Sequence, residues 1–105
     1  MLVTIKNQLQ INRNTEHRIG SGITYGEYFN GYLGEIHFVD GQQLTADAFG
    51  EPDNNGVWQP KDCKDNLTYG TNGFYLNFSD NSSNAGLGTD SSGRNNTWDV
   101  NSLNA

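Results

Sequence analysis

The feature that most constrains this chain of 105 residues is its lack of helical periodicity. Helix-forming residues are rare, and apolar residues never recur at helical spacing over about ten residues. Short runs of alternating apolar and polar side chains occur instead, separated by segments rich in Gly and Asn. Alternation puts successive side chains on opposite faces of a strand, and Gly and Asn supply the positive φ angles of tight turns. The pattern predicts an all-β fold.

Two segments show the clearest alternation, residues 32–39 and residues 73–78. Asn-Gly precedes the first segment and Asp-Gly follows it, and both dipeptides are typical of turns. The apolar side chains of each segment share one parity, so they belong on one face of a strand. We expect the following side chains to be buried and to face one another across strands: Ile36, Phe38, Phe74, Leu76 and Phe78.

Weaker signals complete the expected architecture. Residues 3–11 alternate as a strand or a bent strand pair, and Trp98 and Val100 form a last short alternation. Thr45 can cap one helical turn, which Gly50 then stops. About six short strands at this spacing predict a single domain over residues 1–105, an antiparallel β-sandwich with one short helical turn.

Charge and cysteine content exclude several classes of protein. The net charge is -6, with 6 Lys and Arg against 12 Asp and Glu, which argues against binding to nucleic acid or to an anionic membrane. No apolar run approaches the roughly 18 residues of a transmembrane helix. Cys63 is the single cysteine, which excludes an intrachain disulfide and a cysteine-based zinc site. Stability must come from a small core, helped by oligomerisation or by a larger parent chain.

A family resemblance covers roughly residues 10–100. The string FNGYLGEIHFVDGQQLTADAFG resembles the closing segment of laminin-G-like, concanavalin A-like jelly-roll domains. With GVWQPK, YGTNGFYLNFSDNSS and LGTDSSGRNNTW added, the chain resembles proteins of marine bacteriophages, typically tail-fibre or other virion structural proteins. The resemblance implies a jelly-roll fold and a place on the phage particle, at its surface or on its tail.

The order of the matching segments departs from that family. The stretch GFYLNFSDNSS, continued by LGTDSSGRNN, also resembles the opening of such domains, so the closing half comes first in this chain. A full laminin-G-like jelly roll usually needs well over 105 residues. The chain is then either a fragment that straddles two domains or a complete, circularly permuted small sandwich. We favour a fragment or a compact variant embedded in an oligomer.

Residues 35–40 bear on catalysis, because glucanases of the concanavalin A-like fold carry their acids on one strand. Their motif resembles E-x-D-x-x-E or E-x-D-x-E, in which three acids share a face. Here Glu35 and His37 share a face, but Asp40 has the opposite parity to Glu35. Retaining hydrolysis needs two carboxyl groups about 5–5.5 Å apart, and this face supplies one. We therefore expect no catalytic residues and a solvated strand face at Glu35 and His37.

Two oxygen-rich loops are candidate calcium sites. Calcium takes six to eight oxygen ligands from Asp, Asn and backbone carbonyls, and many lectin-like sandwiches bind it at such loops. Turns held by Asx and Ser side chains explain the same composition, and we favour this interpretation. Bound calcium is the alternative, and no other cofactor is expected. The candidate calcium ligands are Asp80, Asp90, Ser92 and Asn95.

Histidine and cysteine carry weaker signals. His17 and His37 have no third ligand at a familiar spacing, so metal binding through histidine is not expected. Cys63 is interpreted as an incidental thiol, since no His lies near it in sequence.

Aromatic and amide side chains are what a carbohydrate site would use. The apolar face of a pyranose stacks on Trp or Tyr, and Asn forms hydrogen bonds with its hydroxyl groups. For each aromatic taken singly, packing in the core or against another subunit is the favoured alternative. The candidate carbohydrate-binding residues are Trp58, Tyr69, Asn72, Tyr75, Asn77 and Trp98.

These observations lead to a function hypothesis with one rival. The leading hypothesis is a non-enzymatic virion module of a tail fibre or appendage that contacts host-surface glycans. The rival is a capsid decoration, or cement, protein with a purely structural role. Under both hypotheses the partners are other virion proteins and further copies of the chain, with a trimer as the first expectation.

Overall fold

The computed structural model describes residues 11–22, 27–101 and 103. The chain divides into two compact units, Met1–Tyr32 and Leu33–Ala105. In the first unit, an isolated bridge joins Ser21 to Tyr28, and the Phe29 N–H donates to the Gly20 carbonyl at 2.7 Å. The strand expected at residues 3–11 lies outside the described residues, except for the exposed Ile11.

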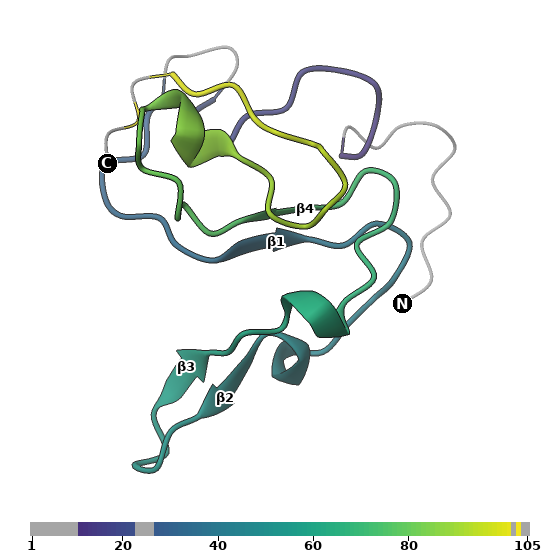
Figure 1. Cartoon of the computed structure of the whole chain (residues 1–105), viewed down its shortest axis with the longest axis vertical. Coiled ribbons are helices and arrows are strands. Elements are labelled where there is room, and N and C mark those ends of the chain that lie inside the picture. The colour runs from purple at the N-terminus through teal and green to yellow at the C-terminus, as the bar shows by residue number, and fades with distance from the viewer. Residues whose placement is uncertain (1–10, 23–26, 102, 104–105) are drawn as a thin grey trace. The chain divides into compact units, whose positions relative to one another are not determined.

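All strands and 3-10 helices of the described residues belong to the second unit (Figure 1). None of the helices in the described part of the chain is long and apolar enough to cross a membrane. The elements, in chain order, are β1 (Ile36–Phe38), the 3-10 helix η1 (Ala46–Ala48), β2 (Gly50–Pro52), β3 (Trp58–Pro60), η2 (Lys64–Asn66), β4 (Phe74–Leu76) and η3 (Ala85–Gly88).

The two segments with the clearest alternation form an antiparallel pair, β1 with β4. Phe38 lies opposite Phe74, and their rings stack with centroids 5.3 Å apart. On the other face, His37 lies opposite Tyr75. The alternation therefore predicts both strands and the pairing of their apolar faces.

The burial of this pair differs from the expectation. Only Leu76 of the five expected core residues is buried, at 3% exposed, and the other four are half-buried. The opposite face holds the more buried rings, because Tyr75 and Tyr69 pack there in parallel with centroids 6.3 Å apart. Both strands are shorter than the alternation predicts: residues 32–35 lie outside β1, and Phe78, with a φ of 56°, lies beyond the end of β4.

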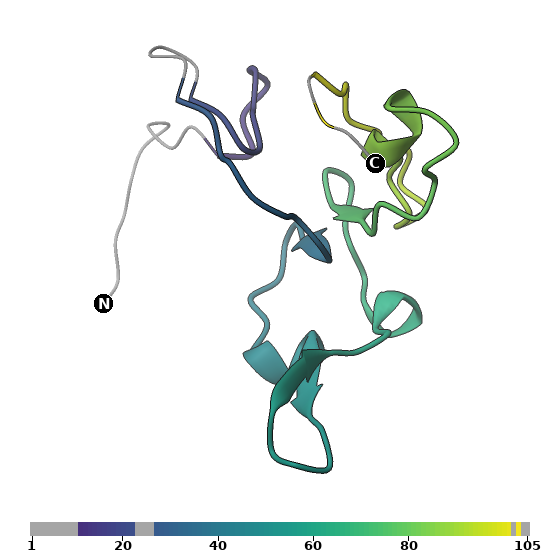
Figure 2. The same ribbon diagram turned by 90° about the vertical axis from the view of Figure 1, so that its left-hand side faces the viewer.

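A second antiparallel pair, β2 with β3, forms a hairpin that projects away from the β1–β4 pair (Figures 1 and 2). Its turn is held by Asp53, whose carboxylate accepts the N–H groups of Asn55 at 2.8 Å and Val57 at 2.9 Å. Gly56 takes the positive φ of 79° that this turn requires. The sequence interpretation places a loop and a short apolar insert here, so the hairpin is a structural feature that it missed.

The helical turn expected after Thr45 is present as η1. Thr45 occupies the capping position in extended conformation, but its hydroxyl donates to the carboxylate of Asp47 and caps no backbone N–H. Residues 98–100, where the sequence predicts a last short strand, have no regular secondary structure. With two small two-stranded sheets and little helix, the described residues are all-β in the broad sense, and the two-layer sandwich stays a prediction.

Candidate functional site

Trp58 is the one exposed ring among the four aromatic side chains of the candidate carbohydrate-binding residues. It lies opposite Pro52 on the β2–β3 hairpin and is 55% exposed. Its indole packs directly on the backbone of Gly50, where an added Cβ would lie 2.7 Å from the indole Nε1. An aromatic ring over a glycine in the neighbouring strand stabilises a short hairpin, and the absence of a side chain at Gly50 makes the contact possible. The structure therefore presents a fixed indole to solvent.

Tyr69 and Tyr75 lie elsewhere and are buried, at 2% and 8% exposed. Their hydroxyl groups are also engaged, Tyr69 with the His37 Nδ1 at 2.9 Å and Tyr75 with the Glu35 carboxylate at 2.6 Å. Burial raises the pKa of both phenols above the ordinary value, so both stay protonated. Neither ring presents a face on which a sugar could stack.

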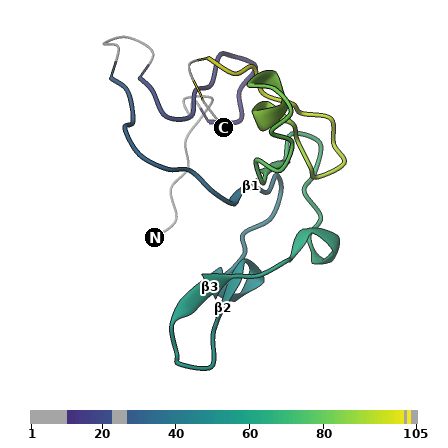
Figure 3. The same cartoon turned by 60° about the vertical axis from the view of Figure 1, so that its left-hand side comes forward.

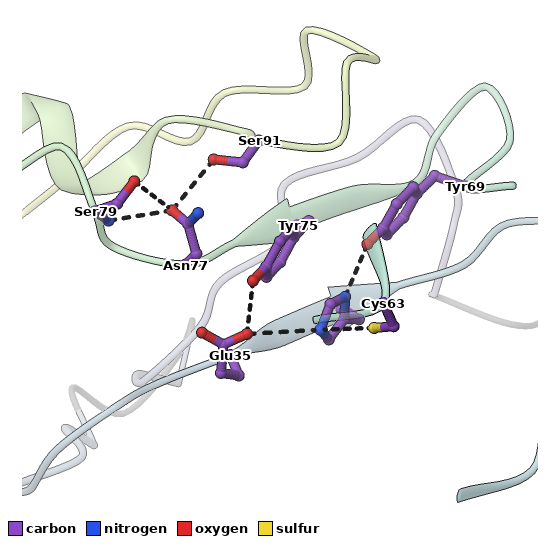
Figure 4. A network of polar contacts seen from close by, with 8 residues as sticks. Glu35, Cys63, Tyr69, Tyr75, Asn77, Ser79 and Ser91 are labelled. Carbon is purple, nitrogen blue, oxygen red and sulfur yellow. Dashed lines mark hydrogen bonds and ion pairs between the residues drawn. The ribbon is translucent and has the colours of Figure 1, made fainter. Parts of the chain in front are cut away.

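The remaining three candidates have structural contacts around β4. Trp98 is half-buried and meets the Phe74 ring edge-on at 5.0 Å. The Asn77 side-chain oxygen accepts bonds from Ser79 and Ser91 (Figure 4), and the exposed Asn72 donates its N–H to Asp40 at 3.1 Å. Of the six candidates, Trp58 alone lies on the hairpin.

Asp90, a candidate calcium ligand, is a buried hydrogen-bond acceptor. One carboxylate oxygen accepts the N–H groups of Tyr75 at 2.8 Å and Ser92 at 2.9 Å. The other accepts the Ser92 hydroxyl and the Asn96 N–H, both at 2.9 Å. Burial alone would raise the pKa of Asp90, but these bonds outweigh it and the pKa is lowered. Four protein donors thus surround the oxygens that a cation would need.

Of the other calcium candidates, Ser92 is half-buried and bonded to Asp90, and Asp80 and Asn95 lie at exposed turns. Asp80 accepts the hydroxyl of Ser82 at 2.6 Å, a bond that lowers the pKa of Asp80. Asn95 is exposed and has a φ of 61°, a left-handed turn conformation that Asn tolerates. Within residues 11–22, 27–101 and 103, no group of three or more His, Cys, Asp or Glu side chains could hold a metal ion.

Sequence reasoning missed a cluster of polar side chains centred on His37 (Figure 4). The His37 ring is 7% exposed and stacks on Tyr75 with centroids 4.2 Å apart. Its Nε2 lies 3.8 Å from the Cys63 Sγ and 3.9 Å from a Glu35 carboxylate oxygen. The term His37 cluster refers below to Glu35, His37, Cys63, Tyr69 and Tyr75.

Two expectations are corrected by this cluster. His37 does not lie on a solvated face, because Tyr75 from β4 and Tyr69 from the loop before β4 cover it. Cys63 has no histidine near it in sequence, but the fold places His37, 26 residues away, beside its thiol. The pairing of β1 with β4 could have placed Tyr75 beside His37, but no pattern in the sequence positions the loop residues Cys63 and Tyr69.

The electrostatics of the His37 cluster favour neutral groups. Burial lowers the pKa of His37, opposed by the nearby Glu35 carboxylate, which acts to raise it. Burial raises the pKa of the Cys63 thiol, which also favours the neutral form. Nucleophilic cysteines use the opposite arrangement, a thiolate stabilised by a charged imidazolium in an accessible site. The Cys63–His37 pair is instead a neutral contact between buried groups.

Comparison with known proteins adds no relative. No protein-family model matches the chain, and neither a curated protein nor a solved structure matches it.

Proposed function

We propose that the chain is a structural module of a bacteriophage virion, on a tail fibre or similar appendage, that contacts host-surface glycans through Trp58. The sequence motifs that resemble phage virion proteins support the setting. The observation that carries the glycan contact is the exposed indole of Trp58, fixed against Gly50 on a projecting hairpin (Figure 3). The module has a jelly-roll-like sandwich architecture in the assembled particle.

The chemistry of the hairpin suits a sugar ring. The apolar face of a pyranose can stack on an indole, and a ring that is already fixed loses little conformational entropy when it binds. The hairpin turn next to Trp58 carries exposed Asn54 and Asn55, whose amides can bond to sugar hydroxyl groups. A single platform of this kind binds weakly, and several copies on one particle would raise the avidity.

Replacement of Trp58 by Ala tests the glycan contact. The full chain is applied to an array of bacterial surface glycans, and the strongest binder is then titrated calorimetrically. Trp58→Ala should weaken binding by about tenfold or more, as expected for loss of a central aromatic contact. Val57→Ala is the matched control, since Val57 is 61% exposed and adjacent in the chain, and it should change binding by less than about twofold.

The same titration tests the calcium alternative. We propose that the contact needs no bound calcium, because Asp90 is already surrounded by protein donors. Binding should be equal with EDTA and with added calcium. Loss of glycan binding in EDTA would show that the contact requires calcium. Equal binding by Trp58→Ala and by the parent chain would reject the role of Trp58.

A structural role on the capsid, as a decoration or cement protein, is the second candidate. A run of exposed aromatic side chains in the first unit favours it, with Tyr28 at 79%, Phe29 at 57% and Tyr32 at 101% exposed. Exposed aromatics of this kind are enriched where protein surfaces meet. We propose that they join copies of this chain, with a trimer as the closed arrangement.

Sedimentation velocity at micromolar protein tests this assembly. The parent chain should sediment as a trimer, and a double variant with Tyr28→Ser and Tyr32→Ser should shift toward the monomer. Both side chains are exposed in the single chain, so circular dichroism should show the same fold for both proteins. A folded parent chain that sediments as a monomer would contradict the proposed assembly.

A further inference from the structure

The two ends of the β2–β3 hairpin meet at one side chain, His37. Phe49 immediately precedes β2, and its ring contacts the His37 ring with centroids 5.4 Å apart. Cys63 follows β3 along the chain, and its Sγ lies 3.8 Å from the His37 Nε2. A backbone bond from the Lys61 N–H to the Phe49 carbonyl, at 3.1 Å, closes the base of the hairpin between these two contacts.

We propose that His37 is an acid-sensitive anchor of the hairpin: the neutral ring holds both ends in place, and protonation of the ring releases them. The inference goes beyond the proposed glycan contact and does not depend on it. Binding of one proton to His37 would shift the equilibrium between the anchored and the released form of the hairpin that carries Trp58.

Protonation of His37 changes the hydrogen bonding in the His37 cluster. A neutral imidazole has one nitrogen that donates and one that accepts. The Tyr69 hydroxyl can serve at Nδ1 in either role, while the Cys63 thiol can donate to an Nε2 that carries no proton. In the imidazolium both nitrogens donate, so the thiol can no longer donate to Nε2 and offers it only a weakly accepting sulfur.

The surroundings of His37 also compensate a positive charge poorly. Tyr75 from β4, Tyr69 and Cys63 are neutral when protonated, and Phe49 brings no charge. Among the described residues the carboxylate that faces His37 is that of Glu35, and its nearest oxygen already accepts a 2.6 Å bond from Tyr75. At 3.9 Å from Nε2, Glu35 offsets only part of the cost of burying the charge.

The direction of the pH effect follows from linkage. Burial lowers the pKa of His37 in the folded chain below the ordinary value of about 6.5. The unfolded or opened chain therefore binds the proton more readily, so the anchor is firm above that value and weakens as the pH falls below it. One proton changes the opening equilibrium by at most about tenfold per pH unit.

Cys63 provides a direct measure of opening, because it is the single cysteine and is 2% exposed. The rate at which a dipyridyl disulfide modifies Cys63 in the native full chain is divided by the rate for the urea-unfolded chain at the same pH. This ratio removes the pH dependence of the thiol itself. Protection of Cys63 should fall by about tenfold between about pH 7.5 and about pH 5, while circular dichroism shows a folded chain.

Two variants separate His37 from other titrating groups. His17→Gln, the matched control, should keep the pH dependence, whereas His37→Gln should show weak protection that is the same at both pH values. An NMR titration of the His37 ring in the parent chain serves if His37→Gln does not fold, and its midpoint should match that of the protection curve. Protection that does not change with pH, a pH dependence retained in His37→Gln, or midpoints that differ would each overturn the proposal.

Discussion

Replacement of Asp90 by Ala is expected to lower the free energy of unfolding by about 4 kcal/mol, the sum of several lost and unreplaced hydrogen bonds. Asp90 is 9% exposed, and its carboxylate accepts hydrogen bonds from Tyr75, Ser92 and Asn96. Alanine leaves three backbone N–H groups without an acceptor, two of them in the loop that follows Asp90. The bond to the Tyr75 N–H also joins this loop to β4, beside the bond from the Ser91 N–H to the Tyr75 carbonyl, so its loss weakens the attachment of the loop to the sheet.

Asp80→Ala is the matched control, since Asp80 stands in the same Asp-x-Ser arrangement but is exposed. Its removal should leave the midpoint of urea denaturation unchanged within error. The parent chain should also lose stability as the pH falls below about 4, because the lowered pKa of Asp90 means that its stabilisation is present above that value and lost below it. Equal urea midpoints for both variants would show that Asp90 is an ordinary turn residue.

This pair of aspartates shows how far sequence reasoning reaches. The composition identifies both loops as rich in Asx and Ser turns, and the structure has such turns at Asp80 and at Asp90. Nothing local distinguishes the two loops. The difference comes from the N–H of Tyr75, 15 residues away, which reaches Asp90, whereas Asp80 accepts its bonds from Ser82, two residues away.

The strands divide in the same way. Strands β1 and β4 were predictable because alternation and flanking turn dipeptides are local signals. Strands β2 and β3 were missed because each has three residues and contains a proline, which is typical of an edge strand or a loop. What makes them a hairpin is the Trp58–Gly50 contact and the Asp53 turn, and both depend on pairing across the chain.

The His37 cluster was beyond prediction for a related reason. Parity assigns Glu35 and His37 to one face but does not say what covers that face. The cover comes from Cys63 and Tyr69, which lie on either side of η2 in a segment without alternation. Their approach is determined by the path of the loop from β3 to β4, which a single sequence does not reveal.

That path depends on a close backbone approach at Gly73, where substitution should have the second large effect. A Cβ added there would lie 2.0 Å from the Tyr69 carbonyl oxygen and 2.7 Å from the Tyr69 Cβ. The same carbonyl accepts the Asp40 N–H at 2.8 Å, so it cannot move away without breaking that bond. Gly73→Ala must therefore displace Tyr69, and with it the hydroxyl that bonds to His37 at 2.9 Å.

We expect Gly73→Ala to lower the free energy of unfolding by about 3 kcal/mol, at the upper end of the usual cost of overpacking, because the obstacle is backbone and not a flexible side chain. Gly34→Ala is the matched control, since a Cβ there meets no heavy atom within 4 Å and the φ of Gly34 is not in the left-handed region. It should be neutral or stabilising by about 0.5 kcal/mol, through the reduced freedom of the unfolded chain. Urea denaturation measures both variants, and a Gly73→Ala chain as stable as the Gly34→Ala chain would mean that the loop from β3 to β4 takes another path, one in which Tyr69 does not cover His37.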